Sequence, residues 1–165
     1  MQVSRPNIFK EIKRNPNKLW LDKNENIDQK LLNFVKKKTK LTKEILSSYP
    51  NLSFTYKKIA NFYKVNKYSL LLAHGSDGGI QNIFQALVKK NTHVILSNPT
   101  FAMYNVYAKA FDAKISYIKY SLNNKGSLSL DIKNLLSLLK KKPKLFCLPN
   151  PDSPSGSSLN NKLLD

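Results

Sequence analysis

Residues 145–156 read Leu-Phe-Cys-Leu-Pro-Asn-Pro-Asp-Ser-Pro-Ser-Gly, a short apolar run followed by a polar turn that contains three prolines and ends in glycine. Each proline fixes its own φ and pushes the preceding residue into an extended conformation, so the turn is stiff before anything binds. A loop that follows a strand is the usual place for a ligand in an open α/β sheet. On its own, the pattern is equally compatible with a surface loop that only joins two elements.

Upstream of this turn, short apolar runs alternate with helical patterns. In residues 77–90, for example, Ile80, Ile83, Phe84, Leu87 and Val88 recur at helical spacing. The predicted strands are 70–73, 94–96, 113–120 and 144–148, and the predicted helices are 29–38, 54–64, 77–90, 100–111 and 131–142, the last with Asp131 as N-cap. This order predicts an α/β fold with three α-β-α layers and a mostly parallel sheet.

The length and the cysteine content favour one domain in a reducing compartment. A chain of 165 residues buries a core that needs no disulfide or metal. Cys147 is the only cysteine and is expected to be a small apolar core residue. No apolar run approaches the roughly 20 residues that span a bilayer. We therefore expect a cytoplasmic protein without a membrane partner, with a basic N-terminal arm over residues 1–18 and one domain over residues 19–165.

The formal net charge of +18 raises the possibility of a polyanion partner. Only Arg5 and Arg14 are arginines among the 28 basic residues, whereas nucleic-acid readers depend on arginine for paired contacts to phosphates and bases. The lysine excess also fits an AT-rich coding sequence. We therefore expect no specific nucleic-acid partner and keep a noncatalytic polyanion-binding protein as the alternative function.

Five motifs occur in a fixed order along the chain. They are Leu-Trp-Leu-Asp-Lys-Asn-Glu-Asn at 19–26, Tyr-Pro at 49–50, Gly-Ser-Asp-Gly at 75–78, Asn-Pro-Thr-Phe-Ala-Met-Tyr at 98–104, and the turn at 149–156. Together they resemble the class I/II aminotransferases that use pyridoxal 5'-phosphate, and most of all the histidinol-phosphate aminotransferase branch. The resemblance spans about residues 19–160 and corresponds to the first half of such an enzyme. It implies an incomplete large domain of the fold-type I pyridoxal-phosphate transferases.

The resemblance implies a cofactor site made by three segments. Gly75, Ser76 and Asp77 match the turn that holds the cofactor phosphate through backbone amides, a task that suits a helix start. Phe101 matches the aromatic residue that lies on the pyridine ring. Ser153 stands where the family has an asparagine that donates to the phenolic oxygen of the cofactor. By local rules alone, Ser76 and Asp77 could simply cap a helix, and Phe101 could simply pack in the core.

Two further residues receive roles from the resemblance. Tyr49 matches a tyrosine that reaches across the dimer interface to the phosphate bound by the neighbouring subunit. Asn24 matches the asparagine of a substrate-binding segment, although Ile27 stands where the family commonly has proline. We also expect a cis bond at Asn98–Pro99 or Ser153–Pro154, and we expect Ser76, Asp77, Phe101 and Ser153 to converge at one end of the sheet.

The residues that carry out catalysis in this family fall after the turn. The Schiff-base lysine lies in a Ser-x-x-Lys loop, and the carboxylate that keeps the pyridine nitrogen protonated lies in an Asp-Glu-Ala-Tyr segment. Residues 157–165, which follow the turn, contain neither motif, so we assign this chain no catalytic residue and no metal ligand. The expected function is that of a truncated aminotransferase for an amino acid or a histidinol-phosphate-like amine and a 2-oxo acid, inactive alone, forming a homodimer or pairing with a complementing C-terminal half. Half of a pyridoxal-phosphate-dependent decarboxylase is a further alternative.

Overall fold

The computed structural model describes residues 15, 17–18, 26–122, 126 and 128–159. The chain divides into two units, one formed by Arg5–Leu70 and the other by Leu71–Asp165 together with Met1–Ser4. Most of the N-terminal arm lies outside the described residues, so the division at residue 18 stays a prediction.

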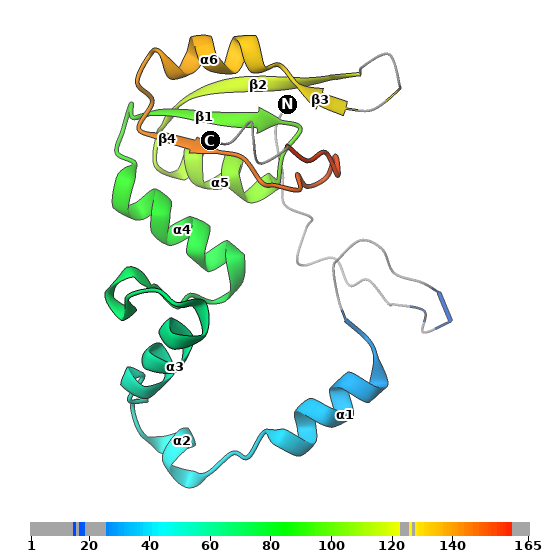
Figure 1. Ribbon diagram of the computed structural model, residues 1–165, viewed down its shortest axis with the longest axis vertical. Coiled ribbons are helices and arrows are strands. Elements are labelled where there is room, and N and C mark those ends of the chain that lie inside the picture. Colours follow the sequence, from blue (N-terminus) through cyan, green and yellow to red (C-terminus); the bar gives the residue numbers. More distant parts are fainter. Residues whose placement is uncertain (1–14, 16, 19–25, 123–125, 127, 160–165) are drawn as a thin grey trace. The chain divides into compact units, whose positions relative to one another are not determined.

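The second unit is built on a four-stranded sheet in the order β3-β2-β1-β4 (Figure 1). The strands are β1 (His93–Asn98), β2 (Lys114–Leu122), β3 (Leu128–Leu130) and β4 (Leu145–Cys147). Strand β1 pairs in parallel with both β2 and β4, and the short β3 runs antiparallel to β2. The sheet is therefore mostly parallel and confirms the predicted fold class.

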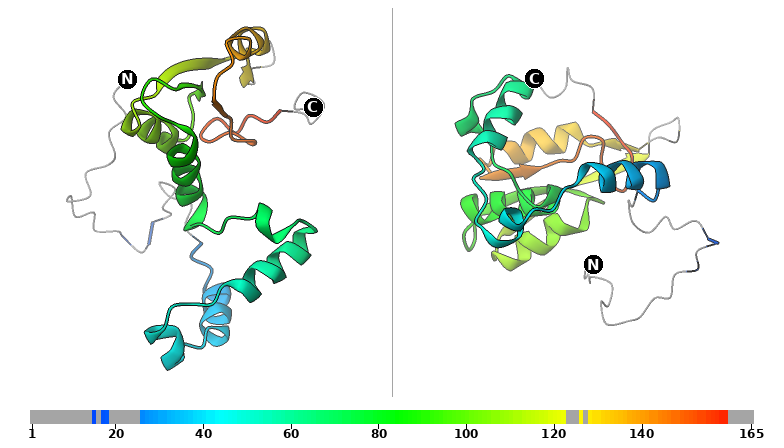
Figure 2. Two further views of the ribbon diagram at one scale, coloured as in Figure 1. Left: turned by 90° about the vertical axis from the view of Figure 1, so that its left-hand side faces the viewer. Right: turned by 90° about the horizontal axis from the view of Figure 1, so that it is seen from below.

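Helices cover both faces of this sheet, with α4 and α5 on one face and α6 on the other (Figures 1 and 2). The helices are α4 (Gly75–Leu87), α5 (Ala102–Ala110) and α6 (Ile132–Leu139). Val94 and Leu96 of β1 pack with Phe84 of α4, whereas Ile95 packs with Leu135 of α6. Strand β1 is an unbroken apolar run because it is buried on both faces, as parallel strands between helix layers are.

The described residues of the first unit form three helices and a short 3-10 turn. They are α1 (Gln29–Lys38), α2 (Lys43–Ser47), α3 (Ser53–Tyr63) and η1 (Lys67–Ser69). Helix α1 has the bounds that the sequence predicts, because the Asp28 side chain caps it by accepting from the Lys30 N–H at 2.7 Å. Among the described residues of this unit only Ala60 is buried. These helices thus expose most of their apolar side chains.

One predicted strand is wrong and three short elements were not predicted. Residues 70–73 form no strand: Leu71 and Leu72 are exposed, and no described strand pairs with this run. An apolar run without a neighbouring strand cannot satisfy its backbone N–H and C=O groups as a sheet does. Elements α2, η1 and β3 are only three to five residues long, too short for a periodic signal.

Candidate functional site

The segments that follow β1 and β4 lie at the same edge of the sheet, because these two strands are parallel neighbours. Phe101 comes three residues after the end of β1, and Ser153 lies in the turn after β4. The two loops therefore leave the sheet at the same edge, and the convergence of Ser76, Asp77, Phe101 and Ser153 at one site stays a prediction. The Asn98–Pro99 and Ser153–Pro154 bonds are both cis, as expected, and Asn150–Pro151 is cis as well.

Asp152 organises the turn after β4 from its buried side. Its side chain is only 4% exposed, and its Oδ2 atom accepts from the Ser155 hydroxyl at 2.6 Å and from the Ser155 N–H at 3.3 Å. The Ser157 hydroxyl ties the turn to β3 by donating to the Leu128 carbonyl at 3.0 Å. Ser153 is exposed. The turn thus buries the Asp152 carboxylate and leaves the Ser153 hydroxyl exposed to solvent.

A cluster of oxygen atoms surrounds this carboxylate. The Tyr120 phenol, at the end of β2, interacts with Ser97, Asp152 and Ser155. Burial raises the pKa of Tyr120, and the charge of Asp152 raises it further. Ser97 Oγ and Asp152 Oδ1 are buried and have no well-aligned hydrogen-bond partner within the described part of the chain. A neutral Tyr120 hydroxyl is the donor that this acceptor-rich site needs.

Phe101 and Tyr104 form the aromatic part of the site. Their rings are perpendicular, with centroids 6.2 Å apart, and both side chains are partly buried. Burial is the main cause that raises the pKa of the Tyr104 phenol, and Cys147 and Asp152 add to it. Tyr104 therefore stays protonated next to the turn, in addition to the packing role that its helical position predicts.

The start of α4 has the geometry of an anion-binding helix terminus. Gly75 has a φ of +67°, and an added Cβ would meet no atom within 4 Å, so the backbone conformation alone calls for glycine. The first N–H groups of a helix have no carbonyl partner within it. Asp77 is drawn toward α5 because its Oδ1 accepts from the Tyr107 hydroxyl at 2.9 Å. The exposed Ser76 stands in the same first turn.

The structure does not test two further residues that the resemblance assigns to the site. Tyr49 is fully exposed and belongs to the unit formed by Arg5–Leu70. Asn24 lies outside the described residues. The roles of both residues stay predictions.

Sequence reasoning missed the layer that supports the two loops. Tyr107, Tyr120 and Asp152 hold the segments that carry the predicted ligand contacts, and none of them was assigned a role. The one available signal was an acidic residue inside a proline-rich turn, where a carboxylate often accepts from nearby backbone N–H groups.

Cys147 is expected to be almost unreactive in the folded chain. Burial raises the pKa of its thiol to about 12, from a reference value of 9.0. At pH 8 the thiolate fraction, and with it the rate of alkylation by iodoacetamide, should be about 1000-fold lower than in urea. Because the folded pKa is the higher one, the neutral thiol stabilises the fold below pH 9, and this contribution is lost as the pH rises toward 12. Equal alkylation rates with and without urea would contradict this.

The residues that the structure describes form neither a membrane span nor a metal site. None of these helices is both long and apolar enough to cross a membrane. The described histidine, cysteine, aspartate and glutamate side chains form no group of three that could hold a metal ion.

Comparison with known proteins gives a consistent family assignment. The family model for aminotransferase class I and II matches residues 16–165. Histidinol-phosphate aminotransferase from Methanococcus aeolicus is 26% identical over 132 residues, which cover 74% of this chain and 35% of the relative. The enzyme of that name from Clostridium novyi is 30% identical over 112 residues, which cover 67% of this chain and 31% of the relative. The chain thus spans about a third of the length of these relatives.

Solved structures show the same fold. Histidinol-phosphate aminotransferase from Sinorhizobium meliloti, in complex with pyridoxal-5'-phosphate, matches with a TM-score of 0.57 at 19% identity and covers 66% of this chain and 28% of its own. A pyridoxal-phosphate-bound putative aminotransferase from Clostridium difficile matches with a TM-score of 0.62 at 20% identity, over 81% of this chain and 34% of its own. With the family model matching nearly the whole sequence, this chain belongs to the class I and II aminotransferases.

Proposed function

We propose that this chain supplies the phosphate-binding and ring-contacting part of a pyridoxal-phosphate-dependent aminotransferase site. The complete site transfers an amino group between an amino acid or a histidinol-phosphate-like amine and a 2-oxo acid. The observation that carries the proposal is that the loops after β1 and β4 meet at one edge of a parallel sheet, in a chain of this family. The Schiff-base lysine of the complete site lies outside these 165 residues.

The residues present fit the cofactor phosphate. The start of α4 offers the positive end of the helix dipole and the Ser76 N–H in its first turn. The one carboxylate in the first turn, that of Asp77, accepts a hydrogen bond from Tyr107, which offsets part of its charge and holds it toward α5. A dianionic phosphate therefore meets backbone donors with less repulsion.

The residues present also fit the cofactor ring. Phe101 offers a partly buried aromatic face, held by its contact with Tyr104, and the exposed Ser153 offers a hydroxyl that donates to the phenolic oxygen. When bound, pyridoxal phosphate supplies an electron sink for the bonds at the amino-bearing carbon of the substrate. The contribution of this chain is to bind and orient the ring, while Asp152 and Tyr120 keep the turn in place.

The remaining parts of the site come from outside the unit that contains the sheet. In a homodimer, Tyr49 contacts the phosphate bound by the other subunit, and Asn24 contacts the substrate. The lone cysteine, Cys147, which is buried and reduced, supports a cytoplasmic setting.

A proline substitution tests the phosphate contact directly. Ser76→Pro removes one backbone N–H at the start of α4, where a helix tolerates proline. Loss of one hydrogen bond to a charged phosphate costs about 1.5–3 kcal/mol, so the Kd for pyridoxal phosphate should rise by about 10- to 150-fold in equilibrium dialysis.

Two controls separate this effect from damage to the fold. Gln29→Pro makes the same chemical change at the first position of α1, in the other unit, and should leave the affinity unchanged. Pyridoxal, which lacks the phosphate, should bind the wild-type chain and Ser76→Pro equally. If Ser76→Pro weakens pyridoxal as much as pyridoxal phosphate, or weakens neither, the start of α4 is not the phosphate site.

A further inference from the structure

Lysines are concentrated at one edge of the sheet. The ranges 89–93, 109–114 and 140–144 lead into β1, β2 and β4, and together they contain eight lysines and a single acidic residue, Asp112. All eight lysines are exposed. We call these three ranges the basic edge. Like charges that lie so close together repel one another, and this repulsion is relieved when a polyanion binds.

Backbone hydrogen bonds hold the three ranges of the basic edge side by side. The Asn91 N–H donates to the Asp112 carbonyl at 2.8 Å, which joins the ranges before β1 and β2. The Lys144 N–H donates to the His93 carbonyl at 2.9 Å, which joins the range before β4 to the start of β1. Because β1, β2 and β4 are parallel, all three start at this edge, opposite to the edge that carries the candidate cofactor loops (Figure 1). The basic edge is therefore one continuous surface.

Neither the lysine-rich composition nor the helix dipole explains this concentration. The segments that follow β1 and β4, residues 99–101 and 148–159, have a similar total length and contain no lysine. A cation near the C-terminus of a helix interacts favourably with the helix dipole. Only Lys109, in the last turn of α5, and Lys140, the C-cap of α6, are placed for this interaction. The other six lysines of the basic edge need another explanation.

The residue types of the basic edge fit phosphate groups better than unpaired bases. A lysine ammonium binds phosphate as a point charge, without the paired contacts by which arginine reads bases. Phe111, the one large apolar residue in these ranges, packs against the core. The His93 ring is partly buried and lies 2.9 Å from the Ser116 hydroxyl. The basic edge therefore offers no free ring on which an unpaired base could stack.

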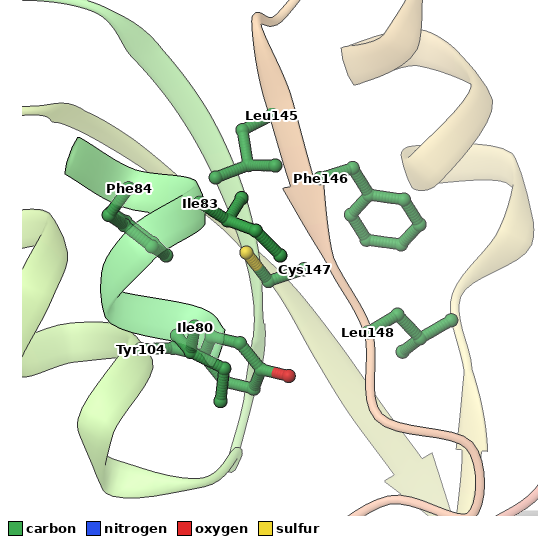
Figure 3. A pocket seen from close by; sticks show the side chains of 8 residues that line it. All are labelled: Ile80, Ile83, Phe84, Tyr104, Leu145, Phe146, Cys147 and Leu148. Atoms are coloured by element: carbon green, nitrogen blue, oxygen red, sulfur yellow. The ribbon is translucent and has the colours of Figure 1, made fainter. Parts of the chain in front are cut away.

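The exposed apolar surface of this unit is separate from the basic edge. An apolar pocket of about 210 Å³ lies between α4 and β4, where Leu145 and Cys147 point toward α4 (Figure 3). No charged residue lines this pocket. Stable attachment to a membrane needs buried apolar groups in addition to a basic patch. The basic edge contains no exposed large apolar side chain, so a membrane surface fits it less well.

We propose that the basic edge is a sequence-independent binding surface for the phosphate backbone of a nucleic-acid duplex. A DNA duplex carries one negative charge per about 1.7 Å of its axis and keeps its bases stacked inside, so lysines bind it without reading its sequence. The described residues contain no arginine, which agrees with a surface that does not read bases. This inference does not rest on the proposed function, because the two surfaces lie at opposite edges of the sheet.

The test is a fluorescence-anisotropy titration of labelled DNA and RNA duplexes of about 20 base pairs with the full chain. If at least four lysines contact phosphates, the Kd should rise by at least about 100-fold when the salt concentration is raised from about 50 to about 200 mM. A duplex of unrelated sequence should bind with the same Kd. Binding of either duplex supports the proposal, and the tighter of the two identifies the source of the phosphates. Polyglutamate and phosphatidylserine vesicles should bind at least about tenfold more weakly.

A triple variant locates the surface. It removes one lysine from each range of the basic edge, by the substitutions Lys89→Gln, Lys114→Gln and Lys141→Gln. The slope of log Kd against log salt concentration should become shallower by about 2 to 3, because each lost phosphate contact removes about 0.9 from it. Since exposed lysines contribute little to stability, the circular dichroism spectrum should not change.

The control variant removes the same charge from three exposed lysines outside the basic edge, by the substitutions Lys57→Gln, Lys119→Gln and Lys133→Gln. It should keep the wild-type slope. Absence of binding to both duplexes at low salt, a Kd that does not depend on salt, equal effects of the two variants, or equally tight binding of polyglutamate or vesicles would each overturn the proposal. These measurements need no pyridoxal phosphate, so they can succeed even if the cofactor proposal fails.

Discussion

Replacing Phe84 with alanine is expected to lower the free energy of unfolding of the sheet-containing unit by about 3–5 kcal/mol. Phe84 is completely buried in the cluster that joins α4 to Val94, Leu96 and Cys147, and its ring lies 6.1 Å from that of Tyr107. Since small domains are stable by only about 5–15 kcal/mol, this loss removes a large share of the stability of the unit. Urea denaturation followed by amide exchange in β1 measures the loss.

The control for this substitution is Phe62→Ala. Phe62 is 79% exposed and lies in the other unit, so its removal should shift the unfolding of the sheet-containing unit by less than about 0.5 kcal/mol. If both substitutions cost the same, the packing of α4 on the sheet does not hold this unit together.

The second large effect concerns chemistry. The purified chain is expected to show no transamination above background and no site-specific lysine adduct after borohydride treatment with pyridoxal phosphate. The physical reason is that neither a Ser-x-x-Lys nor an Asp-Glu-Ala-Tyr segment follows the turn in residues 157–165, and a lysine forms a stable Schiff base only where a site activates it. Absorbance, an amino-transfer assay and mass spectrometry of the trapped chain provide the measurement.

The corresponding positive experiment mixes this chain with the part of the Clostridium novyi relative that it does not match. If the proposed function is right, the mixture transfers amino groups and the trapped lysine is found in the added polypeptide. A single trapped lysine in this chain, together with measurable transamination by the chain alone, would show that one of its own lysines performs the reaction and would refute the proposed division of the site.

The sequence by itself determined the fold class and the order of the elements. The 3.6-residue pattern of Ile80, Phe84 and Leu87, the apolar run of β1 and the Asp28 and Asp131 caps act over a few neighbouring residues, so they can be read locally. The same holds for the Pro-rich turn and for the motif order that indicated the family. The predicted strand at 70–73 failed because a strand also needs a neighbour, which no local pattern reports.

Only the tertiary structure determined which residues support the candidate site and which strand lies at the border of the sheet. Tyr120 meets Asp152 and Ser97, and Tyr107 meets Asp77, across 23 to 32 residues of sequence. These contacts depend on the strand order and on the register of the sheet. Both result from many weak interactions between residues that are far apart in the sequence, so no single segment encodes them. The position of β4 at the border of the described sheet has the same origin, because an apolar strand reads alike in the middle of a sheet and at its border, and only pairing distinguishes the two.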